Sequence, residues 1–380
     1  MPQVFIPTES EPGETRVAAT PDTVKKLLAS GFAVTVQAGA GERASFRDAA
    51  YLAAGATLEH DGARGLATAD VVLKLHAPRS AAELPKEGAA LVSFLYPHLR
   101  VPLVKELAQK KVSAFAMELV PRITRAQRMD ALSSQSNIAG YKAVLMAADK
   151  LGKLFPMLMT AAGTITPARV VILGAGVAGL QAIATARRLG AQVEVSDIRP
   201  AVKEQVESLG ARFIEVAAAQ SDAQDKGGYA KEASAEFKKA QEEALRKKVA
   251  EADVVICTAL IPGRPAPKLL PKSMVELMRP GSVIVDLAAE QGGNCALTQP
   301  GETAVVNGVT ILGVRNVPAL VPIHASDMYA KNVLYFLQNM TKDMAKTGVL
   351  DIDLKDEITA GSLVTHQGKV VHAATAALCG

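Results

Sequence analysis

The segment from Val170 to Asp197 constrains the fold of this chain more than any other part of the sequence. Val170 to Leu173 is an apolar, β-branched run that leads directly into Gly174–Gly179, which reads Gly-Ala-Gly-Val-Ala-Gly, and then into a helical pattern from Leu180 to Leu189. This is G-x-G-x-x-G in a strand–turn–helix context. The first glycine permits a tight turn, the second lets the backbone approach a pyrophosphate, and the third lets the helix pack on the strand. The pattern predicts a dinucleotide-binding βαβ unit whose helix N-terminus attracts phosphate.

An acidic residue stands where this motif needs one. The next expected strand ends at Ser196 and is followed by Asp197, at the spacing of the acid that binds the ribose hydroxyls. A carboxylate there repels a 2′-phosphate and favours NAD over NADP, whereas Arg199 just beyond it could accommodate that phosphate. A Rossmann-like turn that binds no nucleotide is the structural alternative. The candidate nucleotide-binding residues are Gly174, Ala175, Gly176, Val177, Ala178, Gly179, Asp197, Ile198 and Arg199.

Short apolar strands alternate with helices twice along the chain, which predicts two α/β domains. The first set occupies the N-terminal third, and the second begins at Val170 after a long helical pattern from about Leu132 to Lys150. Continuous apolar strands with helices between them imply parallel sheets covered on both faces. We therefore expect two Rossmann-like, doubly wound parallel-sheet domains with a nucleotide cleft between them. The expected domains are residues 1–132 with 325–380, and residues 133–324.

Several local patterns refine this expectation. Asn307-Gly308 between two apolar runs predicts a hairpin, and a second small hairpin is expected over residues 364–370. A long helix from Ser326 to Lys346 is expected to return the chain to the first domain. Strands are also expected over residues 4–6, 34–36, 71–75, 91–95, 113–116, 192–196, 213–216, 254–257 and 283–287.

The segment from Ala217 to Ala233 interrupts the second set. It has no apolar period and contains Gly227-Gly228 followed by Tyr229. Long irregular segments inside a compact domain are uncommon and often functional. We interpret it as a mobile lid in which Tyr229 closes over bound nucleotide, with a surface insertion as the alternative.

Composition excludes several other classes of protein. The 380 residues carry 42 Lys and Arg against 38 Asp and Glu, an excess too small to indicate a nucleic-acid partner. The three cysteines, Cys257, Cys295 and Cys379, are far apart and form no C-x-x-C, so we expect a reducing compartment and no metal site. The uncharged stretch from Val170 to Ala186 is short for a membrane span and is explained by the dinucleotide motif. We expect a soluble chain without a secretory signal.

The most unusual segment runs from Arg122 to Asn137 and is crowded with polar side chains between an apolar strand and the long helix. We call it the signature loop. The structural alternative is a solvated linker in which Ser133 or Ser134 caps the helix that follows.

The signature loop decides in favour of a known family. Pro121–Gln127 followed by Met129–Asn137 resembles the corresponding loop of the NAD(H)-binding subunit of proton-translocating NAD(P) transhydrogenase. One departure is Arg128, where that family would have a small residue. Further stretches that resemble the family in order along the chain are Met159–Thr164, Gly179–Ala186, Gly227–Glu232, Ala259–Gly263, Gly292–Cys295 and Met328–Asn332.

The resemblance implies a function and a set of site residues. Arg122, Gln127, Asp130 and Ser133 would line the nicotinamide end of the site, where hydride transfer occurs, and Tyr229 and Ala259 would also contact the nucleotide. NAD(H) would be bound by this chain and NADP(H) by a domain of a partner, because the chain holds one G-x-G-x-x-G fingerprint. The partners would be membrane-spanning transhydrogenase subunits that place a homodimer of this chain at the cytoplasmic face of the inner (plasma) membrane.

Alanine dehydrogenase, which shares the two-domain fold, is the competing interpretation. Arg16, Lys74 and His98 resemble its substrate-binding and catalytic groups. Oxidising an amino acid requires a base and a cation for the carboxylate, whereas hydride exchange between two nicotinamides requires only close placement. Against the dehydrogenase stand Glu290, where it would have Asp, and the polar signature loop.

Overall fold

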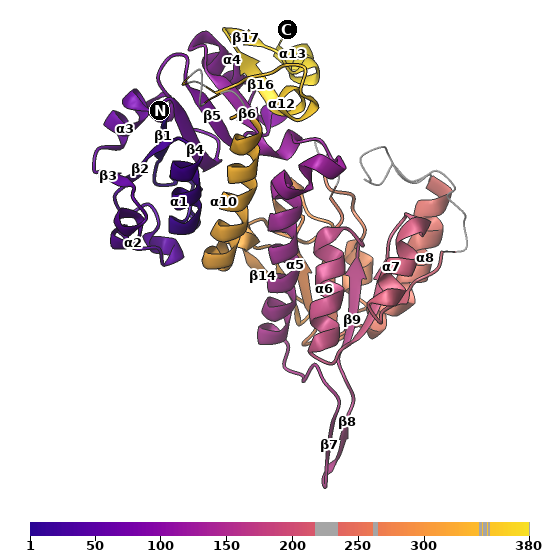
Figure 1. Ribbon diagram of the computed structural model, residues 1–380. Helices are drawn as coiled ribbons and strands as arrows, with labels where there is room; N and C mark the ends of the chain where they lie inside the picture. The colour runs from indigo at the N-terminus through magenta and orange to yellow at the C-terminus, as the bar shows by residue number, and fades with distance from the viewer. Residues whose placement is uncertain (217–234, 261–264, 342–343, 345–347, 349, 380) are drawn as a thin grey trace. The chain divides into compact units, whose positions relative to one another are not determined.

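The computed structural model describes the chain except residues 217–234, 261–264, 342–343, 345–347, 349 and 380, so the expected lid with Tyr229 lies outside the described residues (Figure 1). The chain divides into two compact units. Unit 1 comprises Met1–Gln135 and Ala319–Gly380, and unit 2 comprises Ser136–Pro318. These limits lie within a few residues of the domains expected from the sequence. Each unit is an α/β fold and is considered by itself.

Unit 1 contains an eight-stranded sheet of order β17-β16-β6-β5-β4-β1-β2-β3. Strands β1 to β6 are parallel, and their order is that of a Rossmann fold. The strands are β1 (Gln3–Ile6), β2 (Ala33–Gln37), β3 (Thr57–Glu59), β4 (Val71–His76), β5 (Ala90–Phe94), β6 (Ser113–Ala116), β16 (Leu363–His366) and β17 (Lys369–Val370). The helices are α1 (Pro21–Ala29), α2 (Asp48–Ala53), α3 (Gly62–Thr68), α4 (Val101–Gln109), α10 (Pro322–Asn339), α12 (Glu357–Ser362) and α13 (Ala373–Cys379), with the short 3₁₀ turns η1 (Glu42–Ala44), η2 (Ala81–Glu83), η3 (Pro97–Leu99), η4 (Met117–Leu119) and η5 (Thr124–Met129).

Unit 2 repeats the arrangement with a seven-stranded sheet of order β11-β10-β9-β12-β13-β15-β14. The strands are β9 (Arg169–Leu173), β10 (Gln192–Ser196), β11 (Arg212–Phe213), β12 (Val254–Cys257), β13 (Val283–Asp286), β14 (Thr303–Val306) and β15 (Val309–Leu312), and β7 (Leu158–Thr160) with β8 (Gly163–Ile165) forms a separate hairpin. The helices are α6 (Val177–Arg188), α7 (Lys203–Ser208), α8 (Ala235–Glu251) and α9 (Lys272–Val275), with η6 (Pro200–Val202) and η7 (Ala289–Gln291). Helix α5 (Ala131–Lys150) and turn η8 (Val317–Leu320) carry the chain between the units.

Alternating side chains of each sheet bury two separate apolar layers, because both faces of a doubly wound sheet are covered by helices. In β9, Val170 and Ile172 belong to one buried cluster, and Val171 and Leu173 belong to the other. In β1, Val4 and Ile6 lie on one face, while Phe5 lies on the opposite face. The expectation of Rossmann-like α/β folds is therefore confirmed.

The structure corrects several details. Each sheet ends in an antiparallel edge, β16 on β6 in unit 1 and β14 on β15 in unit 2, so neither is purely parallel. The strand expected over residues 213–216 is only Arg212–Phe213, because the chain leaves the sheet there. Helix α10 ends at Asn339 rather than at Lys346. The exposed hairpin β7–β8, which extends away from the rest of unit 2 in Figure 1, was not predicted.

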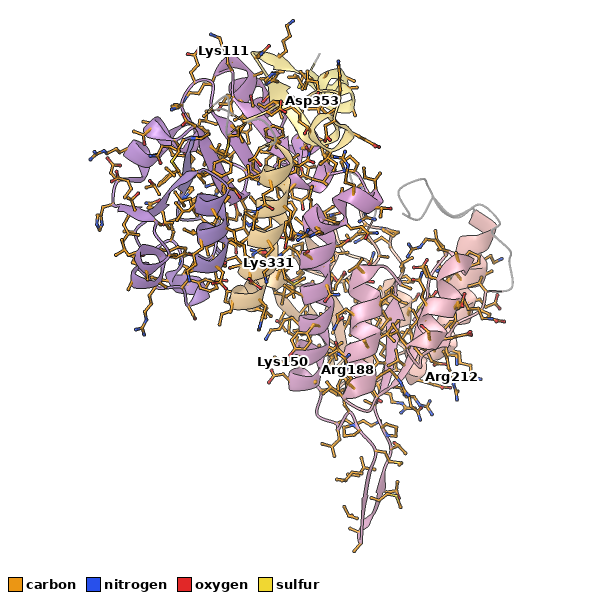
Figure 2. The ribbon with its side chains drawn as sticks, in the orientation of Figure 1. Lys111, Lys150, Arg188, Arg212, Lys331 and Asp353 are labelled. Carbon is orange, nitrogen blue, oxygen red and sulfur yellow. The ribbon has the colours of Figure 1, made fainter. Side chains whose placement is uncertain are left out.

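Helices α5 and α6 approach each other unusually closely in unit 2. A Cβ atom on Gly140 of α5 would lie 2.1 Å from the carbonyl oxygen of Ala178, in the first turn of α6. Basic residues Lys150 and Arg188 end the two helices and lie at the same end of unit 2 (Figure 2). Cations at helix C-termini complement the helix dipoles, which leaves the opposite end of α6 electropositive.

None of the described helices combines the length and the apolarity that crossing a bilayer requires. Within the described part of the chain, no cluster of three or more His, Cys, Asp or Glu side chains is arranged to hold a metal ion.

The contact at Gly140 yields a stability prediction. Gly140→Ala should lower the free energy of unfolding by about 1–3 kcal/mol, because the added methyl group meets rigid backbone and forces the helices apart, which outweighs alanine's better helix propensity. Gly152→Ala is the control, since no described atom lies within 4 Å of its Cβ position. Urea unfolding of both variants measures the difference, and equal stabilities would show that α5 can shift without cost.

Candidate functional site

The fingerprint turn of unit 2 lies between β9 and α6 and is shaped by close backbone contacts. Gly174 has φ +105°, a conformation that L side chains rarely adopt. A Cβ atom on Gly179 would lie 2.0 Å from the carbonyl oxygen of Gly174. At Gly176, by contrast, no described atom lies within 4 Å of the Cβ position, and no described side chain caps the helix that begins at Val177. The turn therefore leaves open the backbone where a pyrophosphate would approach.

Asp197 stands directly beside this turn, at the end of β10. Its carboxylate accepts hydrogen bonds from the backbone N–H of Ala175 at 2.7 Å and from the backbone N–H of Arg199 at 2.9 Å. The Arg199 guanidinium also donates to both carboxylate oxygens, through Nε at 2.9 Å and Nη2 at 2.7 Å. The hydrogen bond to Asp197 raises the pKa of Arg199. The predicted acid is thus joined to the glycine turn, and the predicted arginine is its ion-pair partner.

The remaining fingerprint residues follow from this geometry. Ala175 is buried, whereas Val177 at the start of α6 is 37% exposed. Ala178 and Ile198 are partly buried. The structure thus brings together the residues from Gly174 to Gly179 with Asp197, Ile198 and Arg199.

Two residues that the sequence did not single out hold the neighbouring segment. Thr258 donates its hydroxyl to the carbonyl oxygen of Gly174 at 2.9 Å, which places the predicted residue Ala259 against the glycine turn. The buried Asn294 accepts from the N–H of Ala259 and donates to the carbonyl oxygens of Ala259 and Pro267. The backbone polar groups of Ala259 are therefore already paired. Only the Gly-Gly pair before Asn294 could have drawn attention to it.

The signature loop of unit 1 contains η5 and the start of α5. Asp130 precedes the first residue of α5 and accepts from the backbone N–H of Ser133 at 2.8 Å and from its hydroxyl at 2.6 Å. Asp130 therefore caps the helix, and the alternative expectation of a cap at Ser133 or Ser134 is wrong. Arg122 Nε lies 3.9 Å from Asp130 Oδ2. Gln127 is exposed in η5. Arg122, Asp130 and Ser133 thus lie together.

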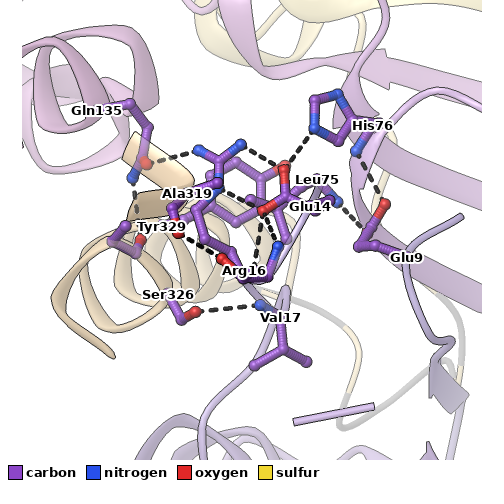
Figure 3. A network of polar contacts seen from close by, with 12 residues as sticks. Glu9, Glu14, Arg16, Val17, Leu75, His76, Gln135, Ala319, Ser326 and Tyr329 are labelled. Carbon is purple, nitrogen blue, oxygen red and sulfur yellow. Dashed lines mark hydrogen bonds and ion pairs between the residues drawn. The ribbon is translucent and has the colours of Figure 1, made fainter. Parts of the chain in front are cut away.

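A buried polar network occupies the N-terminal part of unit 1 (Figure 3). Arg16 donates to both carboxylate oxygens of Glu14 and, through Nη1, to Gln135 Oε1 at 2.7 Å. A ring nitrogen of His76 lies 2.6 Å from Glu14 Oε2. Although burial raises it, hydrogen bonds from Arg16 and His76 hold the pKa of Glu14 well below its usual range. Gln135 in turn donates to the carbonyl oxygen of Ala325, so the network joins the first turns of α5 and α10.

The other residues that suggest a dehydrogenase have structural partners too. Lys74 is 2% exposed, and its ammonium lies 2.9 Å from Glu83 and 3.9 Å from Glu9. His98 is exposed in the turn η3. The basic side chains of Arg16 and Lys74 are therefore explained by internal ion pairs without invoking a substrate carboxylate.

Glu118 in η4 is a buried carboxylate that the sequence did not reveal. Its side chain accepts from the backbone N–H groups of Leu95 and Tyr96, where Tyr96 has φ +46°. Burial raises the pKa of Glu118 to about 7, although these N–H groups favour the ionised form. Glu118 thus fixes the turn that carries His98.

A glycine turn joined to an acidic residue at the end of the next strand, on a sheet of Rossmann order, defines unit 2 as a dinucleotide-binding domain. Comparison with known proteins specifies the family. Residues 5–139 match the N-terminal domain and residues 143–373 the C-terminal domain of Alanine dehydrogenase/PNT. The chain belongs to this family of NAD(P) transhydrogenase alpha subunits and alanine dehydrogenases.

Within the family, similarity is greater to the transhydrogenases. The chain is 52% identical over 380 residues to the first portion of the NAD(P) transhydrogenase alpha subunit of Rhodospirillum rubrum, a separate chain of which 98% is covered, as is 98% of this one. The solved structure of a transhydrogenase from Sinorhizobium meliloti is 45% identical and has a TM-score of 0.87, with 97% of this chain and 100% of that chain covered. An alanine dehydrogenase of Halomonas elongata is 32% identical, with 98% of this chain and 96% of that protein covered.

The buried carboxylate yields a pH prediction. The folded state raises the pKa of Glu118 from 4.5 to about 7, so folding binds its proton more tightly and stability falls as pH rises through this window. The loss amounts to roughly 3 kcal/mol between pH 4.5 and pH 7.5. Glu118→Gln, which keeps an acceptor but cannot ionise, should remove this contribution. Urea unfolding at pH 5 and pH 8 compares the two proteins, and an unchanged pH dependence in the variant would assign the slope to other groups.

Proposed function

We propose that this chain is the NAD(H)-binding subunit of a proton-translocating NAD(P) transhydrogenase and exchanges hydride with NADP(H) held on a partner subunit. The observation that carries the proposal is the fingerprint turn of unit 2, in which Asp197 is joined to Ala175. Similarity over almost the full length to a protein named as a transhydrogenase alpha subunit supports it.

Within this proposal, unit 2 binds the adenosine and pyrophosphate of NAD(H). The backbone from Gly174 to Gly179 and the N-terminus of α6 face the pyrophosphate, and Asp197, Ile198 and Arg199 face the adenosine ribose. In the ligand-free chain the Asp197 carboxylate already receives four hydrogen bonds from Ala175 and Arg199. A ribose diol must therefore displace part of the Arg199 fork. Ala259 and Tyr229 complete the nucleotide contacts, and Tyr229 closes the lid.

The signature loop serves the nicotinamide end. Asp130 and Ser133 hold each other at the start of α5, with Arg122 close to Asp130. This arrangement supports a role in fixing the rotation of the carboxamide. Gln127 is exposed and extends from the loop where a second nicotinamide would enter. The nicotinamide ring supplies the hydride, so these side chains orient and do not act as acid or base.

The partner requirement follows from what the transfer needs. The chain contains a single G-x-G-x-x-G fingerprint, and the described residues include no helix able to cross a bilayer. We therefore infer that NADP(H) and the proton path belong to membrane-spanning partner subunits. The chain would act as a homodimer, peripheral to the cytoplasmic face of the inner (plasma) membrane.

Alanine dehydrogenase is the second candidate, supported by the relatives of that name at 30–32% identity. It needs a cation for the substrate carboxylate. The two buried cations suited to that role, Arg16 and Lys74, each already have a carboxylate partner. The signature loop, with its mutually bonded Asp130 and Ser133, has no evident use in that reaction.

Reconstitution tests the proposal. The purified chain should transfer hydride from NADH to NADP⁺ only when mixed with an NADP(H)-binding partner subunit. Gln127→Asn should slow single-turnover transfer by on the order of 10- to 100-fold, because misplacing the reacting atoms by about 1 Å has effects of that size. Its NADH dissociation constant should stay within about twofold, which is the mark of an interaction made in the transition state.

Gln109→Asn, at the exposed end of α4, is the matched control and should behave as wild type. A parallel fall of affinity and rate would make Gln127 an ordinary binding residue. Oxidation of NADH by pyruvate and ammonium with the chain alone, lost in His98→Ala, would replace the proposed function by alanine dehydrogenase.

A further inference from the structure

One face of α10 holds the 3₁₀ turn η5 at three points. Asn332, Tyr335 and Asn339 are spaced three and four residues apart, so they lie along the same side of the helix. All three contact arginines of η5, while Ala126 and Met129 of the same turn are buried in the core of unit 1. We call these three residues the α10 platform.

Asn332 provides the most specific contact. Its Nδ2 donates to the backbone carbonyl oxygen of Arg128 at 2.9 Å, and the residue is only 6% exposed. Among the described residues, its Oδ1 is buried without a hydrogen-bond partner. A buried acceptor left unpaired destabilises the fold, so stability alone does not account for an asparagine here. What the side chain does provide is a directional bond to the loop.

Arg128 is tied to the platform a second time through its side chain. The guanidinium lies over the ring of Tyr335, 3.6 Å from the ring centroid. A cation over an aromatic face at an exposed site changes an equilibrium by about two- to fivefold. The extra charge at position 128 is thus directed onto α10. Three residues earlier, Arg125 Nη1 bonds Asn339 at 3.2 Å and Asp356 at 2.7 Å.

We propose that Asn332 and Tyr335 are positioning residues that, through Arg128, set the place of Gln127 and Asp130 for hydride transfer. The inference rests on the function proposed above for the signature loop. Arg128 lies between Gln127 and Asp130 in the chain, so fixing its carbonyl and its guanidinium limits how far either neighbour can move. Neither positioning residue needs to touch the nucleotide.

Two substitutions separate positioning from stability. Asn332→Leu removes the bond to Arg128 together with the unpaired oxygen, so the midpoint of urea unfolding should be unchanged or higher. Single-turnover transfer in the complex with the partner subunit should nevertheless fall about tenfold, with the NADH dissociation constant within about twofold. Arg128→Met, an exposed change, should slow transfer about two- to fivefold, and Arg128→Lys should restore most of the rate, because lysine keeps a cation over the ring.

Trypsin gives a readout that needs no activity. The backbone after Arg125 lies in η5, and its cleavage should be faster in Asn332→Leu than in wild type, since cleavage follows local opening. Gln338→Ala is the control on the same helix, because Gln338 bonds Ser30 and not η5. It should match wild type in both rate and cleavage.

The outcomes are distinguishable. If Asn332→Leu transfers hydride at the wild-type rate and is cleaved no faster, the α10 platform does not position the loop. If rate, affinity and unfolding midpoint fall together, Asn332 is a structural residue. If the wild-type chain itself transfers nothing with its partner, the proposed function fails, while faster cleavage would still show that Asn332 holds η5.

Discussion

The structure of unit 2 depends on the contact between the first turn of α6 and the ends of β9 and β12. Gly179 rests against the carbonyl of Gly174, and the Thr258 hydroxyl bonds that same carbonyl. Any side chain at either glycine would separate the helix from the sheet. The contact aims the helix N-terminus, with its unpaired N–H groups, at the open backbone of Gly176, and it brings Ala175 within reach of Asp197.

In unit 1 a different interaction has the comparable role. The buried pair of Glu14 and Arg16 connects the N-terminal loop to Gln135, and Gln135 reaches Ala325 at the start of α10. Removing either charge would leave the other buried and unpaired, which is strongly destabilising. Because α10 carries the platform for η5, the network also supports the signature loop from behind. Binding and transfer thus rely on separate supports in the two units.

The sequence predicts those features that depend on local pattern. Strand–turn–helix periodicity placed the fingerprint and Asp197, and Asn307-Gly308 placed the β14–β15 hairpin, in which both residues have positive φ. It failed where distant segments meet. Thr258 reaches Gly174 across 84 residues and Asn294 reaches Ala259 across 35, so no window of sequence could pair them. Whether Arg199 faces a phosphate or pairs with Asp197 is a matter of rotamer. The helix cap was assigned to Ser133 or Ser134 rather than to Asp130 because all three residues are good caps.

The claim that Asp197 makes unit 2 an NAD(H) site is tested most directly by equilibrium dialysis with NADH and NADPH. Wild type should bind NADH far more tightly than NADPH. Asp197→Asn should weaken NADH binding about 10- to 100-fold and narrow the gap, because a charge-assisted acceptor contributes about 1.5–3 kcal/mol. Glu194→Gln, on the same strand and paired with Lys248, should bind as wild type. Equal affinities of the wild-type chain for the two nucleotides would contradict the account.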